Sequence, residues 1–312
     1  MLDQSSGTIL TEWQDHYAEL FGRHTLCLKH RLHTSPLFSD AALANLLENC
    51  DRQDYHVNLM DKGVRREGEF GDLSGKEILK AVRTGDIWIN LRAPGRVNPA
   101  YDALLDEIYA EFESRVPGLQ TYKRNLTILI SSPKVSVKYH ADVPGQSLWQ
   151  VRGKKRVYLY PAEPPFLPQE AIEKLVINEA HETDMVFQPW FDEYAEVKDL
   201  TPGEMLHWPL NGPHRVENHN SLNVSITTEH WTDTLRNAYA VNYANAMMRK
   251  AGFKNLHRPT AGPALWGRIA LAGAIKFSGV QKRDAKPYRV DFRVDPDAAR
   301  GFRNIKAYDL RK

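Results

Sequence analysis

Cysteine is scarce in this chain, which has only Cys27 and Cys50 among its 312 residues. The two do not form a CxxC pair, so the sequence excludes a disulfide-stapled scaffold and a zinc site built from cysteines. The residues before Thr8 do not show the charged-then-apolar pattern of a secretory signal. We therefore expect a cytoplasmic protein in a reducing compartment.

A long uninterrupted apolar run is also missing. The most apolar segment, 261–280, contains Pro263, Arg268 and Lys276, a pattern that favours an amphipathic helix over a membrane span. The composition, 42% hydrophobic and 26% charged residues, is that of an ordinary globular protein. The sequence thus predicts a soluble protein that has no membrane partner.

The chain has no strong net charge, because its formal charge is only +2. The balance is uneven, however: residues 249–312 contain 16 Lys/Arg and 5 Asp/Glu, which leaves 25 and 34 for the rest. A basic tail can bind nucleic acid or an acidic partner. Here the positive residues are scattered among proline, glycine and aromatic residues, which favours a solvated tail or one docked on its own body.

Residues 1–124 are predicted to form a mixed helical and strand segment that packs on the core. Three helices are expected, each at a recognisable start signal: Ser39 as a cap, Ser74 with Glu77 as a capping box, and Asn98 followed by Pro99. Strands are expected at 55–60 and 86–92.

From Asn125 onwards, short β-rich runs alternate with turn residues, which is typical of a barrel or sandwich. We predict a mainly β protein with flanking helices, whose core at 125–234 is a double-stranded β-helix, the jelly roll of cupins. An irregular insert at 161–196 carries many aromatic residues; it could be a lid for a substrate or a second core. Residues 235–312 are predicted to form a helical and basic extension with an extended tail, which could brace the barrel or build a homodimer contact.

Two strands of this region carry a pattern of metal ligands. His140 and Asp142 stand two apart at one strand end, so they project to the same side. A distant strand, after a Pro-Gly turn and a Pro/Gly corner, presents His214. Two histidines and one carboxylate form the arrangement that holds non-haem Fe(II) and leaves coordination positions open. By the same alternation, Ser136 and Lys138 would share the face of His140.

Other interpretations of these residues stay open. His140 could be incidental on a solvated edge strand. His207, His219 and His230 compete with His214 for the ligand role, although His207 and His230 also fit a packed histidine and His219 a polar turn. The sequence shows no Ser-His-Asp or Cys-His pattern that would point to a nucleophilic enzyme.

The two motif blocks together resemble a known family. The segments NLTILISS, YHAD and WQVRGKKRVYLYP, followed by LTPGEMLHWPLNGPHRVEN and VSITTEHW, are similar to the cupin-type, JmjC-related Fe(II)/2-oxoglutarate oxygenases. The likeness covers roughly 125–231 and is closest to the hydroxylase branch, which uses His-x-Asp.

This resemblance implies roles for five residues. His140, Asp142 and His214 match the iron ligands, and Lys155, fifteen residues after His140, matches the lysine that pairs with the distal carboxylate of 2-oxoglutarate. Ser136 resembles a hydroxyl residue that helps to hold the same carboxylate, provided that a bulge adds one residue between it and His140. An asparagine that some relatives carry near the end of the last strand is replaced by Glu229 in this chain.

The implied activity is hydroxylation of a C–H bond in a protein side chain or small molecule, with Fe(II) as cofactor and 2-oxoglutarate as co-substrate. One alternative is a catalytically silent cupin that binds a ligand or regulates a partner. Another is a metal-dependent cupin enzyme that does not use 2-oxoglutarate. Lys155 separates the oxygenase from this last alternative, because only the 2-oxoglutarate enzyme needs a cation inside the barrel for a dicarboxylate.

Overall fold

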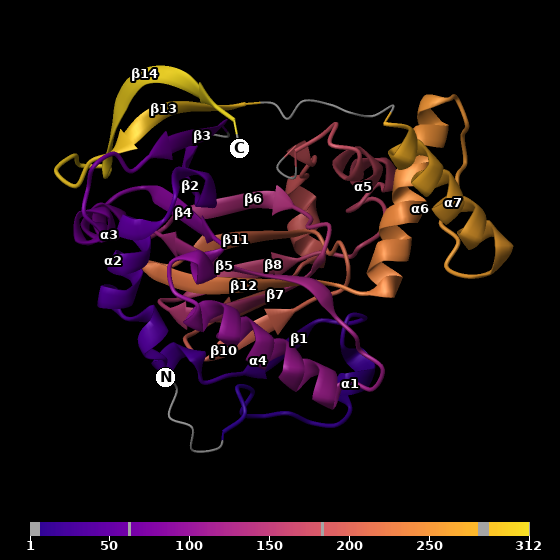
Figure 1. The fold of residues 1–312 in the computed structure, drawn as a ribbon, viewed down its shortest axis with the longest axis horizontal. Coiled ribbons are helices and arrows are strands. Elements are labelled where there is room, and N and C mark those ends of the chain that lie inside the picture. Colours follow the sequence, from indigo (N-terminus) through magenta and orange to yellow (C-terminus); the bar gives the residue numbers. More distant parts are fainter. Residues whose placement is uncertain (1–6, 62–63, 182–183, 280–286, 312) are drawn as a thin grey trace.

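The computed structural model describes residues 7–61, 64–181, 184–279 and 287–311, and in it two β-sheets are surrounded by helices (Figure 1). The large sheet has ten strands in the order β1-β10-β7-β12-β5-β4-β2-β3-β13-β14, and the small sheet has four in the order β6-β11-β8-β9. The strands are β1 (Leu26–Lys29), β2 (Tyr55–Asp61), β3 (Val64–Glu69), β4 (Ile87–Arg92), β5 (Tyr122–Ser131), β6 (Ser136–His140), β7 (Gly145–Arg152), β8 (Lys155–Leu159), β9 (Glu196–Leu200), β10 (Glu204–His207), β11 (His214–Asn218), β12 (Asn223–Trp231), β13 (Tyr288–Val294) and β14 (Phe302–Leu310). The helices are α1 (Tyr17–Leu20), α2 (Asp40–Asn49), α3 (Gly75–Thr84), α4 (Ala100–Arg115), α5 (Gln169–Val176), α6 (Asp233–Lys250) and α7 (Gly262–Ser278).

The eight strands from β5 to β12 form the predicted jelly roll. Four of them, β5, β12, β7 and β10, lie side by side in the large sheet, and the other four make the whole small sheet. The chain changes sheet at nearly every turn, which is the double-stranded β-helix arrangement. The fold class predicted from the sequence is therefore confirmed.

Strand alternation gives the large sheet two faces, which pack against different parts of the protein. On β5, Ile128 and Ile130 point to the outer face and pack with apolar side chains of α2, α3 and α4. Leu129 points between the sheets, where it joins an apolar cluster that includes Val157 of β8 and Val216 of β11. The cavity described below opens beside this second cluster.

Two of the three helix start signals are correct at the level of single hydrogen bonds; at the third, Asn98 accepts from the N–H of Ala100, but the residue that caps α4 is Pro99. The Ser39 hydroxyl accepts from the backbone N–H of Ala42 at the start of α2, and Ser74 with Glu77 forms a complete capping box on α3. The helix α6 begins at Asp233, just before the predicted C-terminal extension, because the side chain of Thr232 caps it.

The insert and the C-terminal helices pack against the chain segment that carries His140 and Asp142. Ala141, which stands between two of the predicted ligands, is fully buried in an apolar cluster with side chains of α5 and α6. Aromatic residues of the insert, Phe166 and Phe191, are buried with Tyr139 and Tyr160 in another cluster, so they form a second core. No helix in the described part of the chain has the length and apolar character required to cross a lipid bilayer.

The C-terminal tail is not an extended arm but a β-hairpin, β13 and β14, that lengthens the large sheet (Figure 1). Strand β13 pairs in parallel with β3, with Phe292 opposite Gly68. Three of the tail's arginines form ion pairs: Arg293 with Glu69, Arg300 with Asp86, and Arg303 with Asp295. The large sheet thus contains strands from all three segments of the predicted division at 124 and 234.

Candidate metal centre

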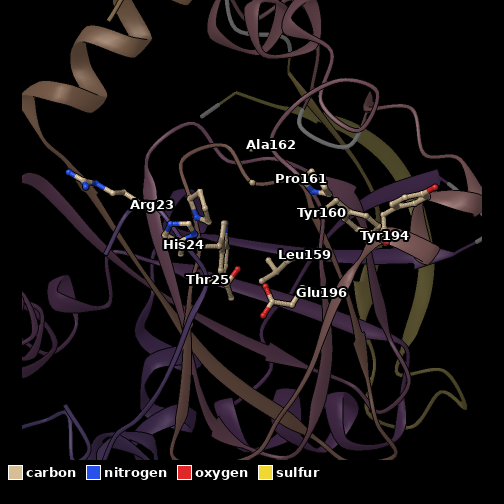
Figure 2. A pocket seen from close by; sticks show the side chains of 12 residues that line it. Arg23, His24, Thr25, Leu159, Tyr160, Pro161, Ala162, Tyr194 and Glu196 are labelled. Carbon is tan, nitrogen blue, oxygen red and sulfur yellow. The ribbon is translucent and has the colours of Figure 1, made fainter. Parts of the chain in front are cut away.

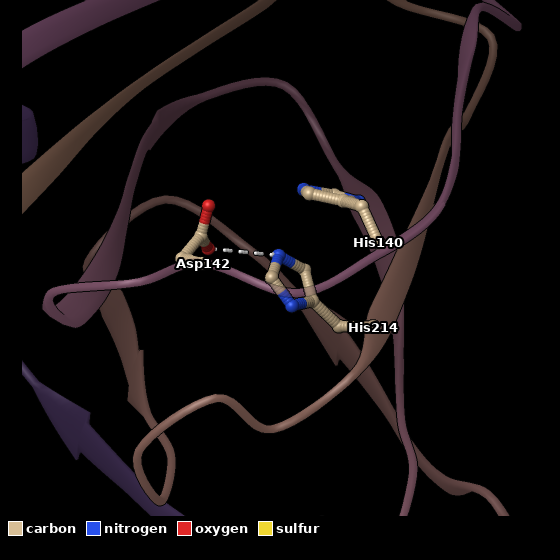
Figure 3. A group of neighbouring side chains, drawn as sticks. All are labelled: His140, Asp142 and His214. Atoms are coloured by element: carbon tan, nitrogen blue, oxygen red, sulfur yellow. Dashed lines mark ion pairs between the residues drawn. The ribbon is translucent and has the colours of Figure 1, made fainter. Parts of the chain in front are cut away.

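Three of the predicted ligands meet at one end of the jelly roll. His140 ends β6, Asp142 follows in the next loop, and His214 begins β11 (Figure 3). One ligand atom from each lies within 4.8 Å of the others, and no other group of three or more such side chains occurs in the described ranges. The Nε2 atom of His214 is 3.5 Å from a carboxylate oxygen of Asp142. This spacing fits a single divalent metal ion between the three side chains.

Hydrogen bonds orient both imidazoles for metal binding. Nδ1 of His140 is 2.7 Å from the carbonyl oxygen of Lys138, and Nδ1 of His214 is 3.0 Å from that of Gly212. Since a carbonyl can only accept, Nδ1 carries the proton in each ring and Nε2 keeps its lone pair. Backbone carbonyls commonly fix metal-binding histidines in this way. The donor set, two imidazole Nε2 atoms and a carboxylate oxygen, therefore fits Fe(II).

Burial keeps His214 neutral. Desolvation, and next the charge of His140, lower the pKa of His214 well below its usual value. The neutral imidazole is the form that binds a metal. Asn211, in the left-handed region at φ 57°, donates from its side chain to the carbonyl oxygen of Asp142 at 2.6 Å, which ties the two ligand loops together.

A bulge in β6 changes the face that the sequence pattern assigned to Ser136 and Lys138. His214 pairs with His140, but Val216 pairs with Val137, so β6 carries one extra residue between these two pairs. Val137 consequently lines the same cavity as His140, whereas Ser136 is exposed. The resemblance required a bulge between Ser136 and His140, and the structure has it, but strict alternation was wrong for this strand because no local residue pattern marks the extra position.

Lys155 lies in the same cavity as the three ligands, a space of about 470 Å³ between the two sheets. Its side chain is 1% exposed. Within the described residues no carboxylate pairs with it, and its Nζ atom lies 5.4 Å from the centre of the Trp88 ring. Desolvation lowers the pKa of Lys155 from 10.5 to about 7. A buried ammonium in such a position has room and need for an anion.

The cavity has further polar walls that the sequence interpretation missed. They come from alternate positions of the large-sheet strands and include Asn90, Arg92, Asn125, Thr127, Gln146, Thr227 and Glu229. The available signal was the placement of polar residues at every second position in strands that are otherwise apolar, as in Asn125 and Thr127 on β5. That signal shows an inward polar face but not its function.

The three histidines that could compete with His214 make other contacts. His207 is stacked on Phe21, with ring centres 4.1 Å apart, and its Nε2 accepts the backbone N–H of Gly22 at 2.9 Å. His230 is buried beside the hydroxyl of Tyr109, and His219 lies near Asp199 at the surface. None of the three belongs to the metal-binding group.

A second, more open cavity of about 430 Å³ lies on the other side of Trp208, which lines both spaces. Figure 2 shows Arg23, His24 and Thr25 on one wall and Tyr160 and Tyr194 on another. Trp208 also packs against the ring of His214. Trp208 thus borders both cavities and contacts a predicted metal ligand.

No protein-family model and no curated protein matches the chain in sequence, but solved structures match it in fold. A structure of YcfD from Escherichia coli covers 87% of this chain and 69% of its own, with 15% identity and a TM-score of 0.52. A YcfD structure described as a ribosomal oxygenase in complex with cobalt and 2-oxoglutarate covers 88% and 69%, at 14% identity and a TM-score of 0.50. Another, also described as a ribosomal oxygenase, covers 91% and 74%, at 15% identity and a TM-score of 0.50. This chain has the YcfD fold.

The likeness to YcfD extends over most of both chains, so it includes the sheets that carry the ligands and not the jelly roll alone. At 15% sequence identity, this likeness establishes the architecture alone. The arguments for metal and co-substrate therefore rest on the side chains of this protein: two histidines protonated on Nδ1, one carboxylate, and the buried Lys155.

Proposed function

We propose that this protein is an Fe(II)- and 2-oxoglutarate-dependent oxygenase that hydroxylates a C–H bond. The observation that carries the proposal is that Lys155, buried without a carboxylate partner in the described chain, shares one cavity with His140, Asp142 and His214. A ligand that reaches both must present an anionic group to Lys155 and metal-binding oxygens to the triad. The keto acid 2-oxoglutarate has both.

In this proposal the chain positions the reactants. His140, Asp142 and His214 would hold Fe(II), and Lys155 would pair with the distal carboxylate of 2-oxoglutarate. When bound, the iron supplies the O₂ chemistry by which 2-oxoglutarate, O₂ and R–H become succinate, CO₂ and R–OH. The sheets shield the reacting atoms from water, and the walls of the cavity direct one C–H bond towards the metal.

The first test is the loss of the metal site. His140→Ala removes one of three ligands, so we expect iron-dependent formation of succinate from 2-oxoglutarate to fall to background, and the bound iron to fall below one per chain. Succinate can be followed by NMR and iron by elemental analysis. Turnover that persists in this variant would refute an Fe(II) centre at this position.

The second test separates the 2-oxoglutarate enzyme from its alternatives. Lys155→Ala should weaken 2-oxoglutarate binding at least tenfold, since it removes the buried cation that pairs with the anion. Lys154→Ala is the matched control, because Lys154 is exposed and pairs with Asp199 at 3.3 Å; it should leave binding unchanged. Equal affinity in both variants would favour a cupin enzyme that does not use 2-oxoglutarate, or a silent cupin.

YcfD is described as a ribosomal oxygenase, and on that analogy we propose a macromolecular substrate, held at the cavity mouth with one side chain inserted. A cytoplasmic location fits the free thiols of Cys27 and Cys50. The predicted homodimer contact, the role of Ser136 in co-substrate binding and the three-segment division remain predictions. Nucleic-acid binding by the tail also remains one, although three tail arginines are occupied by ion pairs within the chain.

A further inference from the structure

Arg92, the last residue of β4, brings a positive charge to the wall of the metal cavity. The residue is exposed, and within the described part of the chain its side chain forms no hydrogen bond and no ion pair. A guanidinium group has five N–H donors and keeps its charge at every physiological pH. The accessible side chain of Arg92 is therefore available to an anion that enters the cavity.

The other charged side chains of the cavity wall already have partners. Besides the metal ligands and the buried lysine, the charged residues that line the cavity are Arg65, Arg92 and Glu229. Nε of Arg65 donates to the side-chain oxygen of Asn58 at 2.8 Å. A carboxylate oxygen of Glu229 accepts from the side chain of Asn125 at 3.5 Å. Of these three, Arg92 is the one to which the described residues give no partner.

The strand register places Arg92 away from Lys155 and towards the metal end of the cavity. Trp88, whose ring centre is 5.4 Å from Nζ of Lys155, lies on the same face of β4, four residues before Arg92. Four residues span about 13 Å along a strand. Arg92 pairs with Thr127 of β5, on the side where β7 begins after the loop of Asp142. Arg92 thus lies on the substrate side of the proposed site.

The charge near Arg92 favours a single carboxylate as its partner. A guanidinium group and a carboxylate are both planar, and they form two parallel N–H···O bonds in which the charges cancel. A phosphate monoester carries up to two negative charges, and the other cation in this part of the described wall, Arg65, is already bonded to Asn58. A cationic group on the substrate would be repelled by Arg92.

We propose that Arg92 is a specificity-determining residue, which binds a carboxylate group of the substrate and thereby directs a neighbouring C–H bond towards the metal. This inference rests on the proposed function, because it takes the cavity to be the substrate site. For the macromolecular substrate proposed above, the carboxylate belongs to an acidic side chain. A substrate with a neutral amide in its place forfeits the ion pair and is bound less tightly.

The first experiment measures anion binding at Arg92 and requires no turnover. The full chain is loaded with Zn²⁺ and 2-oxoglutarate, and propionate binding is followed by ligand-observed NMR. Arg92→Gln should weaken this binding about tenfold, because it removes the charged partner. Arg23→Gln is the matched control: Arg23 is also exposed but lines the second cavity, so propionate binding should not change. A wild-type protein that does not bind propionate, or equal binding by Arg92→Gln, overturns the inference.

Three further probes test the chemical class of the ligand in the same loaded protein. Propionamide, which lacks the charge, and propylammonium, which reverses it, should both bind more weakly than propionate. Arg92→Glu should invert the preference, so that propylammonium binds better than propionate. Methyl phosphate that binds more tightly than propionate would assign a phosphate-bearing substrate and overturn the carboxylate.

The second experiment asks whether Arg92 belongs to the co-substrate site or to the fold. Arg92→Gln should bind 2-oxoglutarate as the wild type does in calorimetric titration, and its melting temperature should not change. A loss of 2-oxoglutarate affinity as large as that of Lys155→Ala would place Arg92 in the co-substrate site. A melting temperature that falls by several degrees would show a structural role. Either result overturns the inference.

The two proposals fail in different ways. If the chain does not bind Zn²⁺ and 2-oxoglutarate in one-to-one titrations, the proposed function fails, and the role of Arg92 fails with it. If both bind but propionate binding does not depend on Arg92, the oxygenase proposal stands and only the role of Arg92 is lost.

Discussion

At the scale of single residues, the chemistry of the cavity depends on how burial changes the pKa of a charged side chain. Burial lowers the pKa of Lys155 to about 7, whereas Lys154 beside it in the chain is exposed and paired with Asp199. The same burial that weakens the positive charge of Lys155 also strengthens its attraction to an anion. Binding of 2-oxoglutarate should therefore depend on pH near neutrality.

The direction of this pH dependence follows from the proton balance. An anion binds the charged form of Lys155, so below pH 7 the lysine is already protonated and affinity is constant. Above pH 7 a proton must be taken up, and affinity should fall about tenfold per pH unit towards pH 9. Calorimetric titration of 2-oxoglutarate from pH 6 to 9 measures this.

Lys155→Arg provides the control for that titration. A guanidinium remains charged over the whole range, so the pH dependence should disappear even if the absolute affinity falls. A wild-type affinity that stays constant between pH 7 and 9 would contradict a titrating Lys155 as the partner of the anion.

At this scale much of the site was accessible from the sequence. The spacing of His140 and Asp142 and the distant His214 predicted the group that the structure brings together. Gln146 was missed because a glutamine in a strand carries no motif. Its place in the cavity wall is a property of three-dimensional packing, and it appears only when the neighbouring strands β12 and β10 are in place.

At the scale of elements, helix packing depends on close approach at a few glycines. Gly75 begins α3, and a Cβ atom there would lie 1.8 Å from the carbonyl oxygen of Ala44 in α2. Backbone cannot move out of the way as a flexible side chain can. The contact between α2 and α3 therefore requires glycine.

Gly75→Ala should destabilise the protein by about 1–3 kcal/mol or more, since it forces two helices apart. Gly267→Ala is the matched control: Gly267 lies within α7, and a Cβ atom there meets nothing within 4 Å. That change should stabilise the protein by up to about 1 kcal/mol through helix propensity. Urea unfolding of both variants measures the difference, and equal stabilities would show that α2 and α3 can separate freely.

Element boundaries and element types were largely predictable, because caps such as Ser74 with Glu77 act locally. The bulge in β6 was expected only as a condition of the family resemblance, because no local signal marks it. Its extra residue is imposed by pairing with β11, so the face on which Ser136 lies depends on a strand far away in the chain. Alternation predicts which residues share a face only where the register is continuous.

At the scale of the whole molecule, buried histidines link stability to pH. Burial lowers the pKa of His30 and His230 to about 4 and that of His207 to about 3, from 6.5 in each case. His207 and His230 both lie against Phe21, whereas His30 packs on Trp149. None belongs to the metal centre.

These histidines predict a loss of stability in mild acid. Between pH 6.5 and 4 the unfolded chain binds protons that the folded chain excludes, so the free energy of unfolding should fall as the pH falls. Each group contributes up to about 1.4 kcal/mol per pH unit. Urea unfolding at pH 7, 6 and 5 tests this, with exposed His24→Gln as a control that should not change the slope. A free energy of unfolding that is flat over this range would contradict the burial of these rings.

The overall chain path was only partly predictable. The jelly roll followed from short strands at even spacing, but the tail was expected to be extended and instead forms β13 and β14 at the edge of the large sheet. Parallel pairing of β13 with β3 leaves no short turn in the sequence to signal it. Which strand β13 pairs with depends on which sheet edge the rest of the fold leaves open.

This pairing has a consequence for the protein during its synthesis. Arg293 and Glu69, which form an ion pair between β13 and β3, are 224 positions apart in the chain. At about 5–20 residues per second, a ribosome needs roughly 10–45 s to make that stretch. For this time β3 is an open sheet edge, able to pair with other nascent chains. The hairpin that completes the sheet therefore also ends the period in which the growing chain is most prone to aggregate.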